Sequence, residues 1–370
     1  MTHARPLRRG WTTGACATAA SKAAFTALLT GKFPDPVDIT LPGGTHAAFS
    51  LAVQSLENGA ATAGIVKDAG DDPDVTHGAL VLATVRQAAP GSGVSFKAGP
   101  GVGAVTLPGL PVPPGEPAIN PVPRQMMRQA IADVAGAAGA PADAEIEISI
   151  PGGEDLAAKT LNARLGILGG LSILGTTGVV VPYSCAAWIA SIHQGIDVAR
   201  ATGLQHVAGA TGRTSEAAVR ALYGLPDGAL IDMGDFAGGM LKYLRYHPVP
   251  RVTVAGGVAK MTKLAQGRLD LHSARGSVDL AALAAIVREN DGSEDLAGKI
   301  TRANTTAEAF NLAMREGLSL GDNVAERAWE TAAKVLAGAP TELDIAIFDR
   351  EGGLVGRSET RRVHAAPPMR

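Results

Sequence analysis

The strongest constraint on the fold is a long stretch without charge, because residues 165–196 contain no Asp, Glu, Lys or Arg. Such a stretch has to be considered as a membrane-spanning helix, which needs about 20 consecutive apolar residues. Glycines at positions 166, 169, 170, 175 and 178, together with Pro182, interrupt any continuous helix here. Irregular backbone facing lipid would leave amides unpaired at several kcal/mol each. We therefore interpret the stretch as a buried, glycine-rich connection with a short strand at residues 179–181.

The chain before this connection has the pattern of an α+β domain. Its 370 residues exceed the roughly 100–200 residues of one ordinary domain, so we predict a first domain at residues 1–183 and a second at residues 184–370. In the first, short strands mix with a few helices. The expected strands are residues 37–41, 47–53, 60–66, 79–85, 94–97 and 145–150, and the expected helices are residues 14–29 and 124–138.

The chain after the connection alternates regularly between strands and helices. We expect strands at residues 205–208, 229–232, 251–255 and 343–348, with helices between them. This alternation is typical of a small parallel sheet covered by helices on both faces, as in Rossmann-like α/β domains. The tail from about residue 354 is rich in arginine and ends near Pro367-Pro368, and we expect it to be disordered.

Composition excludes several classes of function. Lys and Arg total 33 against 35 for Asp and Glu, a net charge of −2, so a general nucleic-acid-binding surface is not indicated. The two cysteines, Cys16 and Cys185, lie far apart, which fits a reducing cytoplasm and excludes a cysteine-built metal site. We interpret Cys16 as a packing residue, with a lowered thiol pKa near a helix start as the alternative. Lys22 interrupts the N-terminal apolar run, so no signal peptide is expected.

Residues 64–78 gather more ionisable groups than any other segment. An apolar run ends at Lys67, and then four aspartates and a histidine follow closely: Asp68, Asp71, Asp72, Asp74 and His77. Three interpretations stay open. The oxygens could bind a divalent metal, the groups could act as acid and base with perturbed pKa values, or the aspartates could cap backbone amides in a solvated turn.

Other segments indicate ligand sites by their position. Thr12 and Thr13 precede an alanine-rich helix, whose start could bind an anion. Residues 209–216 and 256–260 each follow a strand of the predicted parallel sheet, and ligands of such sheets bind at the carboxyl ends of the strands where the strand order reverses. Plain strand-to-helix connections are the alternative. The loop at residues 99–103 is only a weak phosphate-binding signal, because it lacks the P-loop lysine.

Several blocks of sequence together resemble one family. The main ones are LRRGWTTGACATAASKAA from Leu7, VKDAGDDPDVTHG from Val66, and GGVAKMTKLAQG from Gly256 followed by LHS at residues 271–273. GEPAINPVPR from Gly115, LNARLGILGGLSILGTTG from Leu161 and ATGRTSE from Ala210 support them. In this order they resemble the cobalt-precorrin-5B (C1)-methyltransferases of cobalamin biosynthesis.

The resemblance implies a fold, an activity and ligands. The implied fold is a permuted α+β domain resembling the second domain of ribosomal protein S5, followed by an α/β domain with a four-stranded parallel sheet of order 2134. The implied reaction is S-adenosyl-L-methionine-dependent methylation of ring carbon C1 of cobalt-precorrin-5B, giving cobalt-precorrin-6A. The partner is then an anionic tetrapyrrole that brings its own cobalt, and no protein-held metal, nucleic acid or membrane is expected. Homo-oligomer formation is left open.

The matching motifs also imply site residues. Substrate carboxylates need cations and donors, for which the candidates are Arg8, Arg9, Thr12, Thr13, Lys67, Arg124, Lys260 and Lys263. For the cofactor the candidates are Gly209, Thr211, Gly212, Arg213, Gly256 and Gly257. One of Asp68, Asp71 or Asp72 is proposed as base or hydrogen-bond acceptor for the ring, with His77 orienting it.

Two other functions remain as alternatives. Folds like the first domain also host small-molecule kinases, which would bind ATP with Mg²⁺. A corrinoid-binding carrier would bind the tetrapyrrole without producing a methylated product.

Overall fold

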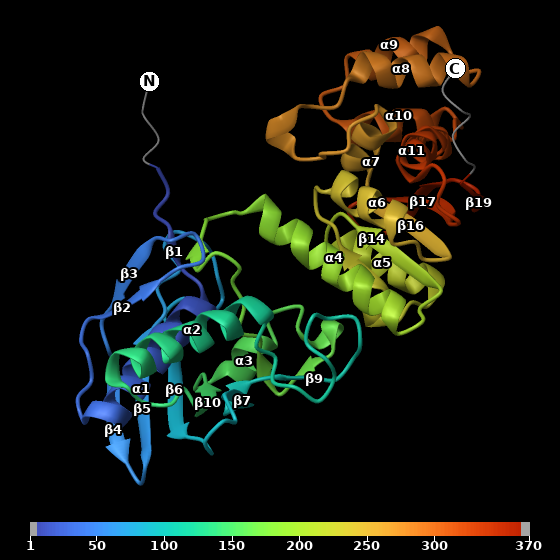
Figure 1. Cartoon of the computed structure of the whole chain (residues 1–370). Coiled ribbons are helices and arrows are strands. Elements are labelled where there is room, and N and C mark those ends of the chain that lie inside the picture. Colours follow the sequence, from blue (N-terminus) through green and yellow to red (C-terminus); the bar gives the residue numbers. More distant parts are fainter. Residues whose placement is uncertain (1–5, 364–370) are drawn as a thin grey trace, which may run out of the picture. The chain divides into compact units, whose positions relative to one another are not determined.

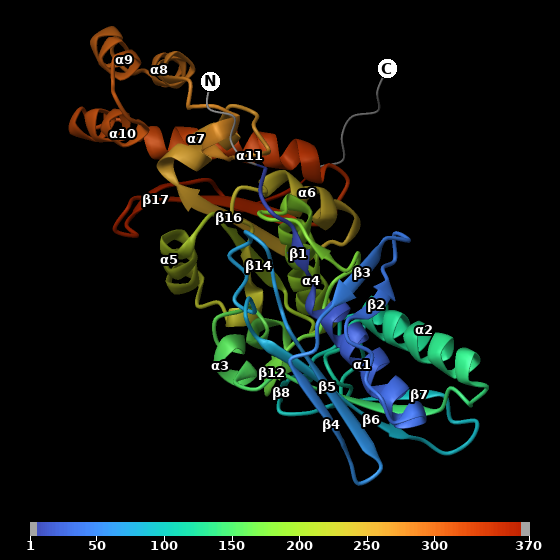
Figure 2. The ribbon, with the colours of Figure 1, turned by 90° about the vertical axis from the view of Figure 1, so that its left-hand side faces the viewer.

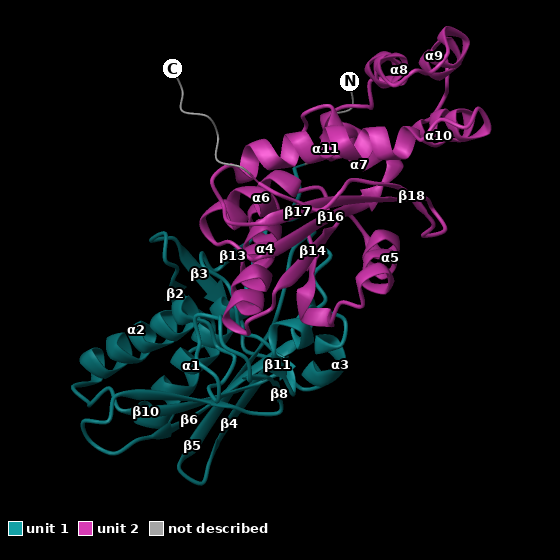
Figure 3. Ribbon diagram, turned by 90° about the vertical axis from the view of Figure 1, so that its right-hand side faces the viewer, with its two compact units in different colours: residues 1–184 teal, residues 185–370 magenta. Residues whose placement is uncertain are grey.

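The computed structural model describes residues 6–363. The chain divides into two compact units, residues 1–184 and 185–370 (Figure 3). The sequence-based boundary lay one residue earlier, after residue 183. Within the described residues, no helix is both long and apolar enough to cross a membrane.

A five-stranded sheet forms the centre of unit 1, with strand order β4-β5-β6-β10-β7. Neighbouring strands are antiparallel except for β10 and β7, which are parallel. The bounds are β4 Val53–Glu57, β5 Ala60–Val66, β6 Leu80–Gln87, β7 Val94–Ala98 and β10 Ala144–Ser149. Helices α1 (Thr13–Thr30) and α2 (Pro121–Ala138) pack against each other, and α1 lies directly on β5 and β6 (Figures 1 and 2).

Helix α1 begins and ends where its sequence dictates. The side chain of Thr12 accepts a hydrogen bond from the amide of Ala15 at 3.2 Å, and Gly31 ends the helix at φ 75°, a left-handed conformation that favours glycine. Its small alanines are almost all buried, so the helix packs closely on the strands. Cys16 is fully buried there, and burial raises the pKa of its thiol to about 12. The packing interpretation of Cys16 is therefore correct, and the lowered pKa is excluded.

The expected strand at residues 47–53 is wrong in one respect, because it is two strands. Strand β3 (His46–Phe49) pairs with β2 (Val37–Thr40) in a separate two-stranded sheet, whereas β4 pairs with β5. The chain passes from one sheet to the other across residues 50–52, which belong to neither strand.

The charge-free connection contains short elements rather than one long one. They are the strands β11 Ile167–Leu168, β12 Gly170–Leu171 and β13 Val179–Val180, and the 3₁₀ helix Ala163–Leu165 ends at the first residue of the connection. The strands pair with β9 (Ala104–Val105), β8 (Gly101–Val102) and β1 (Gly10–Trp11), respectively. The short helix α3 (Gly153–Ala157) precedes them. Leu168 and Leu174 are about half exposed, so the expectation of a uniformly buried connection is wrong.

Unit 2 contains a parallel sheet in which the strands run β15-β14-β16-β17, so the second strand in sequence lies outside the first. The bounds are β14 His206–Ala210, β15 Leu230–Asp232, β16 Arg251–Gly257 and β17 Glu342–Phe348. Helix α5 (Arg213–Tyr223) packs on one face of the sheet. The other face carries α4 (Cys185–Ala201), α6 (Ala237–Tyr246), α7 (Val258–Ala265) and α11 (Leu320–Leu336) (Figure 3). Helices α8 (Leu280–Glu289), α9 (Glu294–Thr301) and α10 (Thr306–Arg315) extend this second layer.

The prediction of a disordered tail from about residue 354 is wrong for its first part. Strands β18 (Leu354–Arg357) and β19 (Arg361–Arg362) pair antiparallel with β17 and extend the sheet. Arg361 also lies over the ring of Trp329 at 4.1 Å and pairs with Glu326. Arg361 is therefore held by residues far away in the sequence, which the sequence of the tail does not indicate. Residues 364–370, including Pro367 and Pro368, lie outside the described residues.

Candidate functional site

The acidic segment is the hairpin loop between the antiparallel strands β5 and β6. Val66 pairs with Leu80, and beyond this pair the amide of Lys67 donates to the carbonyl of Ala79 while that of Gly78 donates to the carbonyl of Lys67. The ends of the loop, residues 67–79, are thus tied together by backbone hydrogen bonds. The antiparallel pairing of β5 with β6 therefore brings the acidic residues together in one loop.

Each of the four aspartates in this loop accepts a hydrogen bond from a backbone amide. The pairs are Asp68 with Gly70 at 2.9 Å, Asp71 with Arg8 at 2.6 Å, Asp72 with Tyr183 at 2.8 Å and Asp74 with Thr76 at 2.8 Å. These contacts support the interpretation of a turn stabilised by its own carboxylates. Among residues 6–363, no group of three or more His, Cys, Asp or Glu is arranged to hold a metal ion.

Lys67 is buried and paired inside the loop. Its side chain is only 3% exposed, and its ammonium donates to Asp74 and to Thr76. The ammonium holds the pKa of Asp74 below its usual range even though burial alone would raise it. The structure therefore corrects the expectation that Lys67 binds the substrate, because Asp74 already compensates its charge inside the loop.

Arg8 and Asp68 form an exposed ion pair at the edge of the loop. Both terminal nitrogens of Arg8 donate to the carboxylate, and the hydrogen bond from Arg8 is the main reason that the pKa of Asp68 falls to about 2. A carboxylate with so low a pKa is a weak base. His77 accepts a hydrogen bond at Nδ1 from the amide of Ala69 at 3.1 Å, which leaves Nε2 to carry the proton of the neutral ring.

The N-terminal segment lies backbone to backbone against the acidic loop. The amide of Trp11 donates to the carbonyl of Asp68 at 2.7 Å, and the amide of Asp71 donates to the carbonyl of Arg8 at 2.9 Å. A Cβ atom at Gly10 would overlap the backbone of Ala69, so the close approach needs glycine there. The loop therefore fixes the position of residues 8–11.

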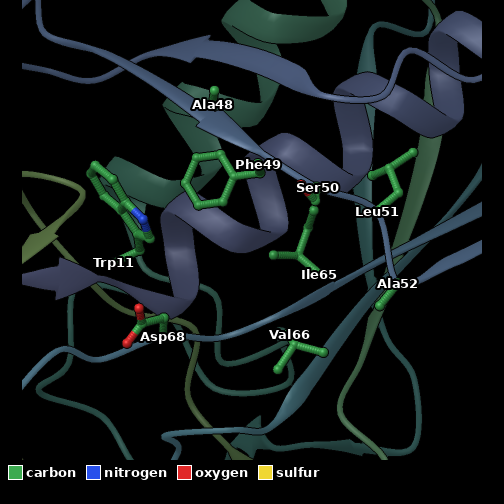
Figure 4. A pocket seen from close by; sticks show the side chains of 9 residues that line it. All are labelled: Trp11, Ala48, Phe49, Ser50, Leu51, Ala52, Ile65, Val66 and Asp68. Atoms are coloured by element: carbon green, nitrogen blue, oxygen red, sulfur yellow. The ribbon is translucent and has the colours of Figure 1, made fainter.

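A groove of about 350 Å³ lies beside this contact (Figure 4). Its lining is mostly apolar and consists of Trp11, Ala48, Phe49, Ser50, Leu51, Ala52, Ile65, Val66 and Asp68. The rings of Trp11 and Phe49 are tilted by 56° with centroids 5.3 Å apart. The sequence interpretation missed this groove. The one available signal was that Trp11, one of three tryptophans in the chain, lies two residues after the arginine pair Arg8-Arg9.

Other predicted substrate residues of unit 1 have structural partners. Arg124 donates to the carbonyls of Ile119 and Pro117 and pairs with Glu116, so its guanidinium is engaged by its own loop. Thr13 is buried, and Thr12 serves as the helix cap. The start of α1 is closed as an anion site, because the amide of Gly14 donates to the carbonyl of Leu174 at 3.0 Å. These expectations are corrected. Arg9 is exposed, and no partner of its side chain is found within the described residues.

The two loops of unit 2 meet at the carboxyl ends of adjacent strands. Ala210 of β14 pairs with Ala255 of β16, and Thr211 and Gly256 follow them in direct contact. A Cβ atom at Gly209 would overlap Met240, and one at Gly256 would clash with Met261 and Thr211. Gly209 and Gly256 are therefore needed for packing, which the sequence could not distinguish from ligand contact.

The lysines near this strand end are also engaged. The ammonium of Lys260 donates to the carbonyl of Thr211 at 2.8 Å and lies 3.0 Å from Asp235, so it ties three strand ends together. Lys263 is buried and donates to the carbonyl of Leu271, which corrects its assignment to the substrate. By contrast, Gly212 and Gly257 have open space beside them at the starts of α5 and α7. Arg213 is exposed at the first position of α5.

A second cluster of ionisable groups lies at the opposite, amino ends of the strands in unit 2. Asp344 is fully buried and accepts hydrogen bonds from Tyr223 and from Thr253, with Arg251 at 3.4 Å. His206 contacts Thr253 at 2.8 Å. Burial lowers the pKa of His206 to about 4, with a further contribution from the charge of Arg251. Burial also raises the pKa of Tyr223 to about 12.

Comparison with known proteins gives consistent matches over the chain. The model of the CbiD family matches residues 1–182, and that of the CbiD C-terminal domain matches residues 270–359. The cobalt-precorrin-5B C(1)-methyltransferase of Bradyrhizobium sp. (strain BTAi1) is 64% identical over 95% of this chain and 94% of the relative. The protein with that name in Agrobacterium fabrum is 63% identical over 99% and 97%, respectively.

A crystal structure of a cobalamin biosynthesis protein, CbiD from Archaeoglobus fulgidus, aligns with 84% of this chain and 85% of its own, at 24% identity and a TM-score of 0.39. The sequence relatives are much closer, and they span nearly the full length of both chains. The chain belongs to the CbiD family, the cobalt-precorrin-5B C(1)-methyltransferases.

Proposed function

We infer that this chain transfers a methyl group to ring carbon C1 of cobalt-precorrin-5B in cobalamin biosynthesis. One observation carries the inference: relatives with this named activity are 59–64% identical over 94–99% of the chain. A methyltransferase needs a methyl donor, and we propose S-adenosyl-L-methionine.

Methyl transfer requires the protein to position its two ligands and needs no covalent intermediate with the protein. The electron-rich ring carbon is itself the nucleophile, which attacks the methyl group while the sulfonium leaves as a neutral thioether. Holding the sulfur, the methyl carbon and C1 in line is worth on the order of 7–11 kcal/mol. Two binding sites that exclude water are therefore the main requirement.

For the substrate we propose the exposed arginines beside the acidic loop. The tetrapyrrole carries acetate and propionate groups, which bind guanidinium through paired hydrogen bonds. Arg9 is exposed, and Arg8, whose two terminal nitrogens pair with Asp68, keeps its Nε–H for a substrate carboxylate. Of the other candidates, Lys67, Arg124 and Lys263 are engaged elsewhere. Lys260 contacts Thr211 and Asp235, and Thr12 and Thr13 are buried at the start of α1.

For the donor we propose the open strand end of unit 2. Gly212 and Gly257 leave space at two helix starts, and the exposed Arg213 could bind the donor's carboxylate. Thr211, Gly209, Gly256 and Lys260 support this surface from beneath through the contacts described above.

For a hydrogen-bond acceptor near the ring we favour Asp71 or Asp72 over Asp68. Asp68 is paired with Arg8 through both oxygens, whereas Asp71 and Asp72 each use one oxygen for a backbone amide. The second oxygen of either residue is then the candidate acceptor. His77 stays the candidate orienting group.

The test is incubation of the purified chain with cobalt-precorrin-5B and S-adenosylmethionine that carries a deuterated methyl group. We expect a product heavier by one deuterated methyl group in place of a hydrogen. Binding of the tetrapyrrole without this product would identify a carrier instead. Consumption of ATP with Mg²⁺, and indifference to S-adenosylmethionine, would identify a kinase.

Some finer expectations are part of the same proposal. They are the likeness of unit 1 to the second domain of ribosomal protein S5, the Rossmann-like character of unit 2, a cytoplasmic location, and the possibility of a homo-oligomer. A mass measurement of the native protein tests the last of these.

A further inference from the structure

We propose that the groove between Trp11, Phe49 and Val66 binds one apolar edge of the tetrapyrrole ring, while Arg8 and Arg9 bind carboxylates on its periphery. The identity of the ligand rests on the proposed function. The lining, the charges and the size of the groove support the site itself.

The lining suits a flat, apolar ligand. Trp11 and Val66 offer partly exposed apolar surface at the groove, and the nearly buried side chains of Phe49 and Ile65 form its floor (Figure 4). Val66 is 53% exposed although it ends a strand whose other residues are largely buried. Covering this surface with a conjugated ring would remove apolar area from water at about 25 cal/mol for each Å².

The charges of the groove are arranged for a ligand with an apolar centre and an anionic edge. Asp68 is the one ionisable residue among the nine that line it, and Arg8 neutralises that carboxylate through both terminal nitrogens. An apolar ring therefore meets no uncompensated charge. Arg9 lies two residues before Trp11, and the Nε–H of Arg8 is not used by Asp68, so both guanidinium groups have hydrogen-bond donors for carboxylates.

The size of the groove limits how much of the ligand enters. Its volume of about 350 Å³ lies at the low end of the range of about 300–1,000 Å³ for small-molecule sites. A tetrapyrrole with eight carboxylate side chains is larger, so one edge of the ring is inserted and the periphery stays at the rim.

The groove is also fixed in shape before a ligand arrives. The backbone of Trp11 is held on one side by the carbonyl of Asp68 and on the other by pairing of β1 with β13. Gly10 packs directly on Ala69. A site that is already ordered loses little conformational entropy when it binds.

The experiment compares binding of two ligands by titration calorimetry in the full-length chain. The probes are uroporphyrin III, a tetrapyrrole octacarboxylate, and S-adenosylmethionine. We expect Trp11→Leu and Phe49→Leu to weaken uroporphyrin binding by about tenfold or more and to leave S-adenosylmethionine binding unchanged. Val66→Asp places a charge on the exposed end of β5 with little risk to folding and should have the same effect. The matched control is Tyr246→Leu, an aromatic residue that is 75% exposed in unit 2, which should change neither affinity.

Each outcome decides the proposal. If uroporphyrin binds all three groove variants as tightly as it binds the unchanged chain, the groove is not its site. If S-adenosylmethionine binding falls instead, the groove holds the methyl donor and the proposal is overturned. Uroporphyrin binding that depends on the groove, in a chain that produces no methylated tetrapyrrole, would uphold the site and contradict the proposed function.

Discussion

The acidic loop of unit 1 and the Asp344 cluster of unit 2 contain the same kinds of side chain but differ in exposure and in role. In the loop, carboxylates tie down backbone amides while Asp68, Arg8 and His77 stay at the surface. In the cluster, Asp344 has no exposed surface and its partners close over it. The loop lies beside a groove, whereas the cluster lies at the strand ends opposite those where ligands of parallel sheets bind.

The difference in exposure distinguishes charged groups that shape a surface site from charged groups that only stabilise the fold. Charges that remain exposed around an ordered backbone can still bind a ligand. Charges that are fully buried and paired cannot, but they make the unit sensitive to the loss of any partner. Four measurements test whether the two regions differ in this way.

Asp344→Ala should have the largest effect, lowering the free energy of unfolding of unit 2 by about 3–5 kcal/mol. The substitution leaves Tyr223 and Thr253 without their acceptor and Arg251 without its counter-ion. Urea unfolding followed by circular dichroism measures the change. Glu351→Ala, an exposed carboxylate after the same strand, is the control and should stay within about 0.5 kcal/mol. A loss below about 1 kcal/mol for Asp344→Ala would show that the cluster is not a stabilising unit.

Asp74→Ala should destabilise unit 1 by about 3 kcal/mol, because Lys67 would keep a buried ammonium without a carboxylate. Adding Lys67→Met should recover a large part of that loss, since the buried charge is then removed as well. Asp72→Ala, which releases one amide hydrogen bond, should cost only about 1 kcal/mol. Equal losses for Asp74→Ala and Asp72→Ala would contradict a special role of the buried pair.

Acid should weaken the two units in different pH ranges. His206 has a pKa of about 4 in the folded chain against its ordinary value of 6.5, so between these pH values the unfolded chain binds a proton that the folded chain does not. Unit 2 should therefore lose stability as the pH falls from about 6.5 to about 4, by at most about 3 kcal/mol. Asp68 has a folded pKa of about 2 against 3.8, so its contribution to unit 1 is complete above about pH 4 and is lost below it.

Urea midpoints between pH 3 and pH 8 measure this difference, and His206→Gln should flatten the slope for unit 2. Gln can still reach Thr253 with a polar atom but does not titrate. A slope that persists in this variant would assign the pH dependence to another group.

Arg9→Glu should have the smallest effect on folding and a clear one on activity. The side chain is exposed and no partner is found in the described part of the chain, so the free energy of unfolding should change by less than about 0.5 kcal/mol. The KM for the tetrapyrrole should rise by about tenfold, because an attraction becomes a repulsion. Lys32→Glu, an exposed charge reversal beyond the end of α1, is the control. Unchanged KM values for Arg9→Glu would remove Arg9 from the substrate site.

Local sequence patterns were sufficient for most of the secondary structure. Strand β5 has the predicted bounds of residues 60–66, since its apolar run lies between a clear turn and the acidic segment. Helix α1 was predicted from its capping threonine and from Gly31. These signals are short-range, so the residues that carry them lie within the element or next to it. The prediction of one strand at residues 47–53 was wrong because the strands on either side of residues 50–52 pair in two different sheets.

The candidate site was harder to predict, because charge is visible in a sequence but burial is not. Lys67 and Lys263 have the right chemistry for carboxylates, yet both side chains are buried and hydrogen-bonded within the protein. The groove brings together Trp11 and Phe49, which lie 38 positions apart, and nothing in either local sequence indicates the other. Arg8 and Arg9 are exposed, and the backbone of Arg8 contacts the acidic loop, which the sequence did not indicate; their role in binding stays a prediction.

The pairing of β1 with β13 joins the first strand of unit 1 to its last. Gly10 lies opposite Val180 and Trp11 opposite Val179, and the amide of Thr12 donates to the carbonyl of Gly178. During synthesis on the ribosome, residues 10–12 emerge early but have no strand partner until residue 180 has left the exit tunnel. Contacts between distant parts of a chain form late because the intervening loop must close first. The wall of the groove that contains Trp11 is thus completed only when unit 1 has been synthesised in full, and in a shorter nascent chain the groove is incomplete.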